Sequence, residues 1–240
     1  MHEHVATPLR LRDLADAAHL SPFHFDRIFR TMTGLSAIAF ASALRINAAK
    51  QLLVSSDASV TDICFELGYE SLGSFVSRFS RSVGVAPGTL RTLLWRDDGA
   101  PIGAAAAADS GSRPAMGGIE GIVAGDVRDD TLVWIGAFAR GIPDGPPLAG
   151  IVVRGNGPFH IEGVRDGAYH VLALGLPHTT TLHGYLAPDA RAWVAKGGCV
   201  CIRRGVADRS VLLAMRPVEV TDPPVLFALP LLRPNAARSK

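Results

Sequence analysis

Cysteines are scarce in this sequence, and the three present form no disulfide pattern. Cys64, Cys199 and Cys201 are too few and too unevenly spread for the disulfide framework of a small secreted domain. We therefore expect free thiols, as in proteins of a reducing compartment.

Long apolar runs are also missing. Hydrophobic residues make up 48% of the chain, but runs such as residues 225–229 are far shorter than the roughly 20 residues that cross a bilayer. The first residues, MHEHVATP, lack the basic and then apolar pattern of a secretory signal. These absences predict a soluble cytoplasmic protein with no membrane partner.

A strong excess of either charge is absent. Residues 1–96 contain 10 Lys and Arg against 8 Asp and Glu, a net charge of 10 − 8 = +2, and the remaining residues contain 14 of each sign. This surplus is small for a protein that binds nucleic acid, so charge alone identifies no partner.

Recognisable catalytic motifs are missing as well. The sequence has no nucleophile elbow, phosphate loop or metal-binding helix. Cys199 and Cys201 would share one face of a strand, and a metal or redox site is one interpretation of them. The commoner alternative is a buried apolar pair. The histidines that could complete a metal site with these cysteines are His160, His170, His178 and His183. We predict no enzyme, no metal and no cofactor.

Hydrophobic periodicity divides the chain into two parts. From Leu11 to Leu94 apolar residues recur at helical spacing, which predicts an all-helical domain. After a stretch rich in Ala, Gly, Ser, Asp and Pro, short runs of Val, Ile and Leu alternate with turn residues. Such runs are typical of an all-β sandwich or barrel. The predicted boundaries are an all-α domain at 1–96, a flexible linker at 97–118, a β-sandwich domain at 119–233 and a tail at 234–240.

An internal repeat is the most informative feature of the helical part. Residues 14–20 align with residues 63–69 at an offset of 49. Each copy is predicted to be a short helix, a tight turn and a second helix, which is the order of a helix-turn-helix. At an offset of 50, Phe25, Phe29 and Gly34 align with Phe75, Phe79 and Gly84.

The turns support this repeat. Ser21 and Ser71 can each cap the second helix of their copy. Gly68 stands where the second copy turns sharply and can adopt a positive φ without steric cost. His19 occupies the same place in the first copy less favourably. An amphipathic helix at 37–55 is predicted to hold the copies at a fixed distance.

The stretch from Leu11 to Arg91 resembles the DNA-binding region of the AraC/XylS family of bacterial regulators. The resemblance rests on LADAAHLSPFHFDRIFR, Gly34, ALRINAAKQLL and VTDICFELGYESLGSFVSRFSRSVGVAP, in that order. It implies two rigidly linked helix-turn-helix units whose second helices enter successive major-groove segments on one face of DNA.

Two positions depart from the family pattern. Ala37 stands where the family often has proline, which Pro87 keeps in the second unit. Ser77 stands where the second unit commonly has arginine, and Arg78 follows one position later. The module also lies near the start of this sequence, whereas the family usually places it last.

The second part of the chain has a looser likeness. Phrases such as VRDGAYHVLAL look like the small prealbumin-like or carboxypeptidase-regulatory β-sandwiches. This resemblance implies a binding or scaffolding module and no reaction.

The recognition helices supply the candidate base contacts. Arg27 is the strongest, because a guanidinium can bond O6 and N7 of one guanine, a pairing that discriminates bases by roughly 1–3 kcal/mol. A solvated surface arginine is the alternative. The base-reading candidates are Phe23, His24, Asp26, Arg27, Ser74, Val76, Ser77 and Arg78.

Further basic residues and the two cap serines are expected to contact phosphates. For each cation, an ordinary surface charge is the alternative interpretation. The phosphate candidates are Ser21, Arg30, Arg45, Lys50, Ser71, Arg81 and Arg91.

These patterns predict a sequence-specific DNA-binding transcription regulator of the AraC/XylS type. Double-stranded DNA is the expected partner, and RNA polymerase, a small-molecule effector and a second copy of the chain are further candidates. The alternative is a ligand-binding or protein-interaction protein with a degenerate helix-turn-helix region. The sparse second recognition helix, with Gly73, Ser74 and Ser77, motivates this alternative.

Overall fold

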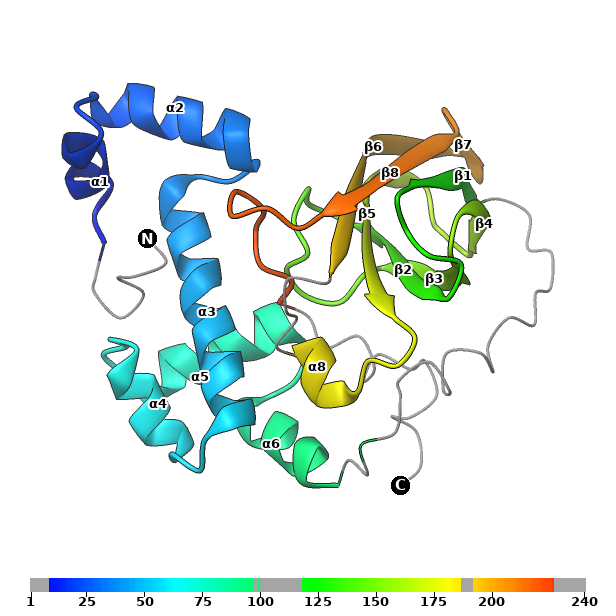
Figure 1. Ribbon diagram of the computed structural model, residues 1–240. Helices are drawn as coiled ribbons and strands as arrows, with labels where there is room; N and C mark the ends of the chain where they lie inside the picture. Colours follow the sequence, from blue (N-terminus) through cyan, green and yellow to red (C-terminus); the bar gives the residue numbers. More distant parts are fainter. Residues whose placement is uncertain (1–8, 97–98, 100–117, 187–191, 227–240) are drawn as a thin grey trace. The chain divides into compact units, whose positions relative to one another are not determined.

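The computed structural model describes residues 9–96, 99, 118–186 and 192–226, and it contains two compact domains (Figure 1). The helical domain comprises residues 1–96 and 220–240, and the β domain comprises residues 97–219. The predicted fold class, an all-helical domain followed by an all-β domain, is confirmed. The predicted linker and tail lie almost entirely outside the described residues.

Among the described residues, six helices form the helical domain. The long helix α3 (Ala37–Ser55) connects two helix pairs and also packs against α6 (Figure 1). Its bounds are those predicted for the connecting helix. The other helices are α1 (Leu11–Ala17), α2 (Pro22–Thr33), α4 (Val60–Glu66), α5 (Leu72–Val83) and α6 (Pro87–Trp95).

Helix α3 is long and apolar enough to cross a membrane by length and composition alone. It nevertheless contains Arg45 and Lys50, and its apolar residues Phe40, Leu44 and Leu53 are buried. A helix with apolar side chains inside and polar side chains among them is typical of a protein core.

The second helix of each pair begins and ends in the same way. Oγ of Ser21 and Oγ of Ser71 each accept a hydrogen bond from the backbone N–H three residues later, at 3.4 and 3.3 Å. Both helices end at a glycine with positive φ, 80° at Gly34 and 91° at Gly84. The predicted starts and stops of the two copies are thereby confirmed.

The turns inside the two copies are equivalent. His19 has a φ of 55° and Gly68 a φ of 73°. A Cβ makes this left-handed conformation unfavourable by roughly 1–2 kcal/mol, and glycine has none. Gly68 therefore suits its turn, whereas His19 is held in the same turn against its preference.

The two copies bury their aromatic residues to different extents. Phe75 and Phe79 of α5 are fully buried, and their ring centroids lie 5.7 Å apart. The aligned Phe25 and Phe29 of α2 have the same 5.7 Å separation but are only half-buried. Phe29 also packs edge to face against Phe40 of α3, with centroids 5.4 Å apart.

The chain returns to the helical domain after the last strand of the β domain. Residues Val220–Leu226, here called the C-terminal segment, belong to the helical domain. Nζ of Lys50 donates a hydrogen bond to the backbone oxygen of Val225 at 2.7 Å. The sequence places this stretch in a β domain that runs to residue 233, so the observed boundary differs from the predicted one.

Eight strands form one continuous sheet in the described part of the β domain. The sheet order is β3-β2-β5-β6-β7-β1-β4, and β8 pairs with both β1 and β6. The pairing of β1 with β8 is parallel, and that of β1 with β4 is antiparallel. The strands are β1 (Gly118–Gly125), β2 (Thr131–Phe138), β3 (Ala149–Arg154), β4 (Gly157–Glu162), β5 (Gly167–Pro177), β6 (Trp193–Arg203), β7 (Val206–Ala207) and β8 (Val211–Pro217).

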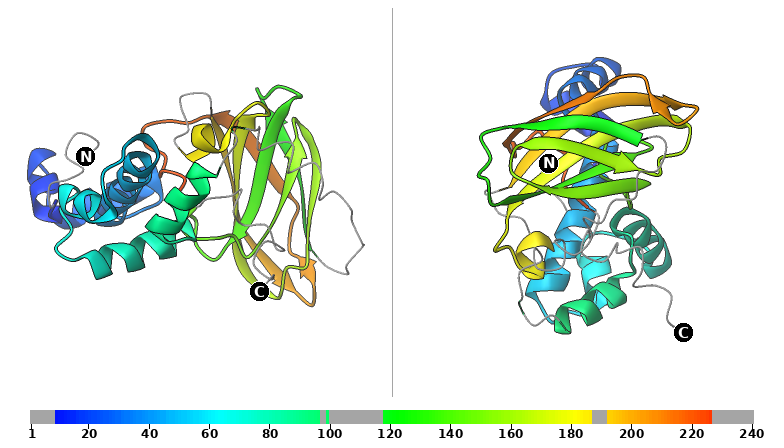
Figure 2. Two further views of the ribbon diagram at one scale, coloured as in Figure 1. Left: turned by 90° about the horizontal axis from the view of Figure 1, so that it is seen from below. Right: turned by 90° about the vertical axis from the view of Figure 1, so that its right-hand side faces the viewer.

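An apolar core lies inside this sheet. Ile135 of β2, Phe159 of β4 and Leu213 of β8 belong to one buried cluster although their strands are not all neighbours. Distant strands share a core only if the sheet curls around it, and Figure 2 shows this curvature. Six of these strands, β1, β2, β3, β5, β6 and β8, overlap apolar runs that the sequence predicts as strands, at residues 119–125, 132–139, 148–154, 168–176, 198–204 and 210–216.

The sequence does not predict three short elements, β4, β7 and α8 (Leu182–Leu186). Strand β4 begins with Gly157 and Pro158, which argue against a strand, but it lies at an edge of the sheet, where a missing N–H is tolerated. Helix α8 is only five residues long. Its Tyr185 packs against Trp134 of β2, with ring centroids 6.0 Å apart.

Candidate nucleic-acid interface

The exposed sides of α2 and α5 form the candidate interface. In α2, Phe23 is 81% exposed, and Arg27 is exposed one helical turn later. The aligned positions of α5 hold Gly73 and Ser77, and both are exposed. A Cβ added at Gly73 would meet nothing within 4 Å. The two helices therefore present side chains of different chemistry from equivalent positions.

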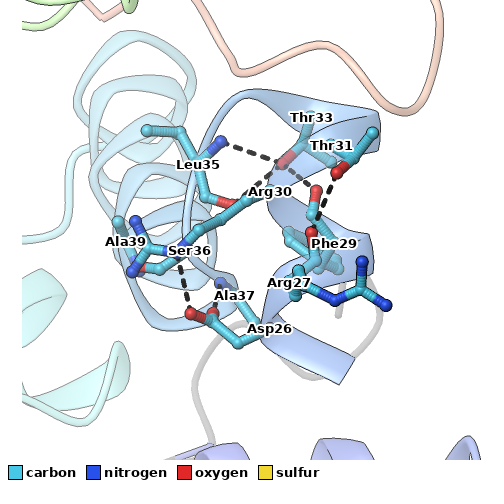
Figure 3. Close-up of polar contacts among 10 residues, drawn as sticks. All are labelled: Asp26, Arg27, Phe29, Arg30, Thr31, Thr33, Leu35, Ser36, Ala37 and Ala39. Atoms are coloured by element: carbon cyan, nitrogen blue, oxygen red, sulfur yellow. Dashed lines mark hydrogen bonds and ion pairs between the residues drawn. The ribbon is translucent and has the colours of Figure 1, made fainter. Parts of the chain in front are cut away.

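Arg27 lies on the outer side of α2. Its Nη2 is 3.1 Å from Nδ1 of His24, which can accept a hydrogen bond when that nitrogen carries no proton. Figure 3 shows the guanidinium pointing away from Asp26 and Ala37. Thr31 is exposed one turn further on, and its hydroxyl donates to the backbone oxygen of Arg27 at 3.0 Å. Sequence reasoning missed Thr31, although its i, i+4 spacing from Arg27 marks it.

Asp26 connects α2 to α3. One carboxylate oxygen accepts a hydrogen bond from the backbone N–H of Ala37 at 3.0 Å, and the other accepts one from Nε of Arg30 at 2.8 Å (Figure 3). The bond from Arg30, supported by that from Ala37, holds the pKa of Asp26 below its usual value. With both oxygens engaged, this carboxylate is placed to orient α2 on α3 and not to read a base.

The second copy has apolar residues at both aligned positions. At the offset of 50, Val76 aligns with Asp26 and Pro87 aligns with Ala37. Pro87 has no N–H to donate, and the half-buried side chain of Val76 has no acceptor. The hydrogen bond between Asp26 and Ala37 therefore has no equivalent at the aligned positions of the second copy.

Two arginines predicted to contact phosphates are engaged within the helical domain. The half-buried Arg45 has its guanidinium carbon 5.6 Å from the ring centroid of Tyr69. The half-buried Arg91 donates from Nη2 to the backbone oxygen of Ser56, the C-cap of α3, at 3.5 Å. In this arrangement both cations contribute to the packing of the domain, and their phosphate contacts stay predictions.

Lys50, also predicted to contact a phosphate, is buried in this structure. The side chain is 1% exposed, and the ammonium donates to the backbone oxygen of Val225. Burial lowers the pKa of Lys50 to about 7. A lysine in this state neither reaches solvent nor keeps its full charge at neutral pH, so it cannot contact a phosphate in this conformation.

The exposed candidates that remain lie on α2, on α5 and at the starts of these two helices. Arg30 keeps 60% of its side chain exposed while paired with Asp26. The starts of α2 and α5 are suited to anions, because backbone N–H groups and the helix dipole point there. His24 and Val76 are half-buried. The exposed polar and basic candidates are Ser21, Arg27, Arg30, Ser71, Ser74, Ser77, Arg78 and Arg81.

The β domain brings no metal-binding group together within its described residues. Cys199 is exposed and Cys201 is partly exposed, so the interpretation of a buried cysteine pair is wrong. His170 lies opposite Cys199 in the pairing of β5 with β6. No three His, Cys, Asp or Glu residues in the described part of the chain are grouped so that they could hold a metal ion. His160 and His178 each face a carboxylate oxygen, at 3.5 and 3.2 Å.

The repeat, its caps and its connecting helix agree with a family comparison. Residues 14–92 match the family model described as a helix-turn-helix domain. The helical domain therefore contains a helix-turn-helix domain, which is called the AraC-like domain below after the family that its sequence resembles. Its two copies, α1–α2 and α4–α5, are called the first and second units below.

Several similar proteins are named as transcription regulators. The uncharacterized HTH-type transcriptional regulator YobQ of Bacillus subtilis is 30% identical over 97 residues, which cover 40% of this chain and 40% of YobQ. The MmsAB operon regulatory protein of Pseudomonas aeruginosa is 35% identical over 99 residues, which cover 41% of this chain and 32% of that protein. The bifunctional transcriptional activator/DNA repair enzyme AdaA of Bacillus subtilis is 29% identical over 85 residues, which cover 35% and 40%.

The chain thus spans 40% or less of the length of these relatives. Among solved structures, the DNA-binding domain of AdpA, a global transcriptional factor crystallised in complex with a target DNA, is similar to the AraC-like domain. Its sequence identity is 30% and its TM-score 0.37, and the match covers 38% of this chain and 83% of that one.

Proposed function

We propose that this chain is a sequence-specific DNA-binding transcription regulator in which α2 and α5 are the recognition helices. The observation that carries this proposal is the repeated arrangement, in which two units with the same caps and turns present exposed helices of equal length. In helix-turn-helix proteins the second helix lies in the major groove. The match at residues 14–92 and the names of the relatives support the same function.

The two recognition helices are proposed to contribute unequally to specificity. Arg27 strongly favours guanine, whereas the aligned Ser77 offers a short hydroxyl that bonds to several bases. Phe23 adds a bulky apolar group where Gly73 has no side chain. In this arrangement α2 makes most of the base contacts, and the arginines of α5 contact phosphates and position the domain on DNA.

Selection of bound sequences from a random DNA pool tests this division, and two half-sites of unequal information content are expected. Arg27→Ala should weaken binding to the preferred site by roughly 1–3 kcal/mol and relax one base position. Ser77→Ala is the matched control and should change little. Arg81→Ala should weaken all sequences about equally and reduce the slope of log affinity against log salt by roughly one.

Half-sites of equal information content, or an unchanged preferred sequence after Arg27→Ala, would contradict the unequal division. Failure to select any sequence at low salt would favour the alternative, a ligand-binding or protein-interaction protein with a degenerate helix-turn-helix region. The bare face of α5, with Gly73, Ser74 and Ser77, is the observation that keeps this alternative in view.

The β domain is proposed to act by association or by binding an effector, without catalysis. Ile122 and Leu212 lie opposite each other on β1 and β8 and are 53% and 62% exposed. Neighbouring exposed apolar side chains favour contact with another surface. A second copy of the chain and RNA polymerase are the proposed partners, and the cytoplasm is the proposed location.

A further inference from the structure

Lys50 occupies an unusual position for a lysine. It lies within α3, the helix that joins the two units, and its side chain is 1% exposed. Lysine is almost never fully buried without a partner, because its ammonium loses hydration. Here the partner is the backbone oxygen of Val225, 175 residues further along the chain.

The C-terminal segment is attached to the helical domain by side chains and single hydrogen bonds. Residues 220–226 form no helix or strand, so no regular ladder of hydrogen bonds holds them. Asp222, Pro223 and Leu226 are buried, whereas Val220 is 73% exposed. Segments held by a few side chains and without regular backbone pairing open locally at low free energy.

Lys50 matters to the charge of the AraC-like domain. Residues 1–96 have a net charge of 10 − 8 = +2, so one lysine accounts for half of the surplus. Burial lowers the pKa of Lys50 to about 7, because the charged form loses its hydration. When Lys50 is buried, the net positive charge of the AraC-like domain is therefore lower than when Lys50 is in solvent.

We propose that the C-terminal segment is a releasable strap that switches Lys50 between a buried structural role and a phosphate-binding role. With the strap docked, Lys50 is unavailable to DNA. With the strap released, Lys50 returns to solvent as a charged group on α3 and adds one phosphate contact. The phosphate-binding half of this proposal rests on the proposed DNA binding, and the shielding of Lys50 does not.

The chain itself links this strap to the β domain. Only Val218 and Glu219 separate the end of β8 from the strap. The backbone N–H of Val218 still donates to the backbone oxygen of Ala192 at 3.1 Å. A change in β8, such as one caused by an effector or a partner of the β domain, therefore reaches the strap within a few residues.

Acylation of lysines in the folded, full-length protein tests the shielding. The sequence contains three lysines, Lys50, Lys196 and Lys240, and Lys196 is an exposed internal reference on β6. By mass spectrometry, Lys50 should react about tenfold more slowly than Lys196, the factor that corresponds to an opening free energy of about 1.4 kcal/mol. Leu226→Ser should raise the acylation rate of Lys50 to that of Lys196. Val220→Ser, the same change at an exposed position of the strap, should not.

Salt dependence of DNA binding tests the phosphate-binding role. Leu226→Ser should steepen the salt dependence by one phosphate contact, an additional loss of about threefold in affinity between 50 and 200 mM salt. Lys50→Gln in the Leu226→Ser chain should abolish this extra loss. Far-ultraviolet circular dichroism checks that the helices persist in each variant.

Four outcomes decide the proposal. Equal acylation of Lys50 in the native and Leu226→Ser chains would overturn the strap. Shielding without any change in salt dependence would overturn the phosphate-binding role. Absence of all DNA binding would contradict the proposed function, and acylation would still decide the strap. If Leu226→Ser unfolds the domain, hydrogen exchange of the native chain replaces it as the test. The amides of residues 225–226 should then exchange before those of α3. Simultaneous exchange would contradict release of the strap.

Discussion

The first and second units have equivalent backbones and use their side chains differently. The second unit buries Phe75 and Phe79 completely and presents a face of glycine and serine. The first unit leaves the aligned phenylalanines half-buried and presents Phe23 and Arg27. Two copies of one motif have thus divided stability and recognition between them, because packing fixes a few buried positions and leaves the exposed face open to change.

The largest expected effect is on the cores of the two units. Phe79→Ala should lower the free energy of unfolding by about 3–5 kcal/mol, because it leaves a cavity in a fully buried site. The matched Phe29→Ala should cost clearly less, because its ring already contacts solvent. Chemical denaturation followed by circular dichroism measures both. Equal losses would show that the two units contribute alike to stability.

The link between the recognition helix and its neighbour should give the next largest effect. Ala37→Pro removes the N–H that donates to Asp26, a bond to a charged group worth about 1.5–3 kcal/mol. The backbone itself suits proline, since Ser36 has a φ of −64° and a ψ of 151° and proline is favoured at the first helical position. In a chain that already carries Asp26→Val, Ala37→Pro should therefore cost little or stabilise the domain, because the two positions then hold the residue types found at the aligned positions of the second unit.

A double-mutant cycle at neutral pH measures this coupling. The pKa of Asp26 is lower in the folded protein than its ordinary value of 3.8. Its stabilising contribution is therefore fully present above pH 3.8 and is lost as the pH falls through the folded-state pKa. The coupling should vanish in the same range. A coupling near zero at neutral pH would mean that the two units attach their recognition helices to the domain by the same forces.

The smallest expected effects are in the turns. Gly68→Ala should destabilise the second unit by about 1–2 kcal/mol, because a Cβ must then adopt a φ of 73°. His19→Gly should stabilise the first unit by about 0.5–1 kcal/mol, because it relieves the same strain at a φ of 55°. Thermal unfolding measures both changes. Stabilisation by Gly68→Ala would show that the equivalence of the two turns is wrong.

The sequence predicts much of the fold because most of its signals are local. Ser21, Ser71, Gly34 and Gly84 mark the ends of α2 and α5, and the bounds predicted for α3 are those observed. Six of the eight strands follow from runs of apolar residues. Strand β4 escapes prediction because Gly157 and Pro158 break its pattern, and only its edge position makes them acceptable.

The candidate site is less predictable, because residue type does not reveal a distant partner. Arg45, Lys50 and Arg91 carry charges suited to phosphates, but their partners are a ring and two backbone oxygens. A backbone oxygen is the same at every residue, so nothing in the sequence singles out that of Val225. The role of Asp26 could have been inferred from the repeat. The first copy has Ala37 where the second has Pro87, so only the first copy has a backbone N–H that can donate at this position.

The contact between Lys50 and Val225 also orders events during synthesis of the chain. Ribosomes add about 5–20 residues per second, so the 175 residues between these two take roughly 9–35 s to translate. During this interval α3 has been made, but the carbonyl that receives its buried ammonium has not. The nascent AraC-like domain therefore passes through a state in which Lys50 is hydrated and charged, and its final packing follows translation of the β domain. The AraC-like domain therefore reaches its final packing only after the β domain that separates Lys50 from Val225 has been translated.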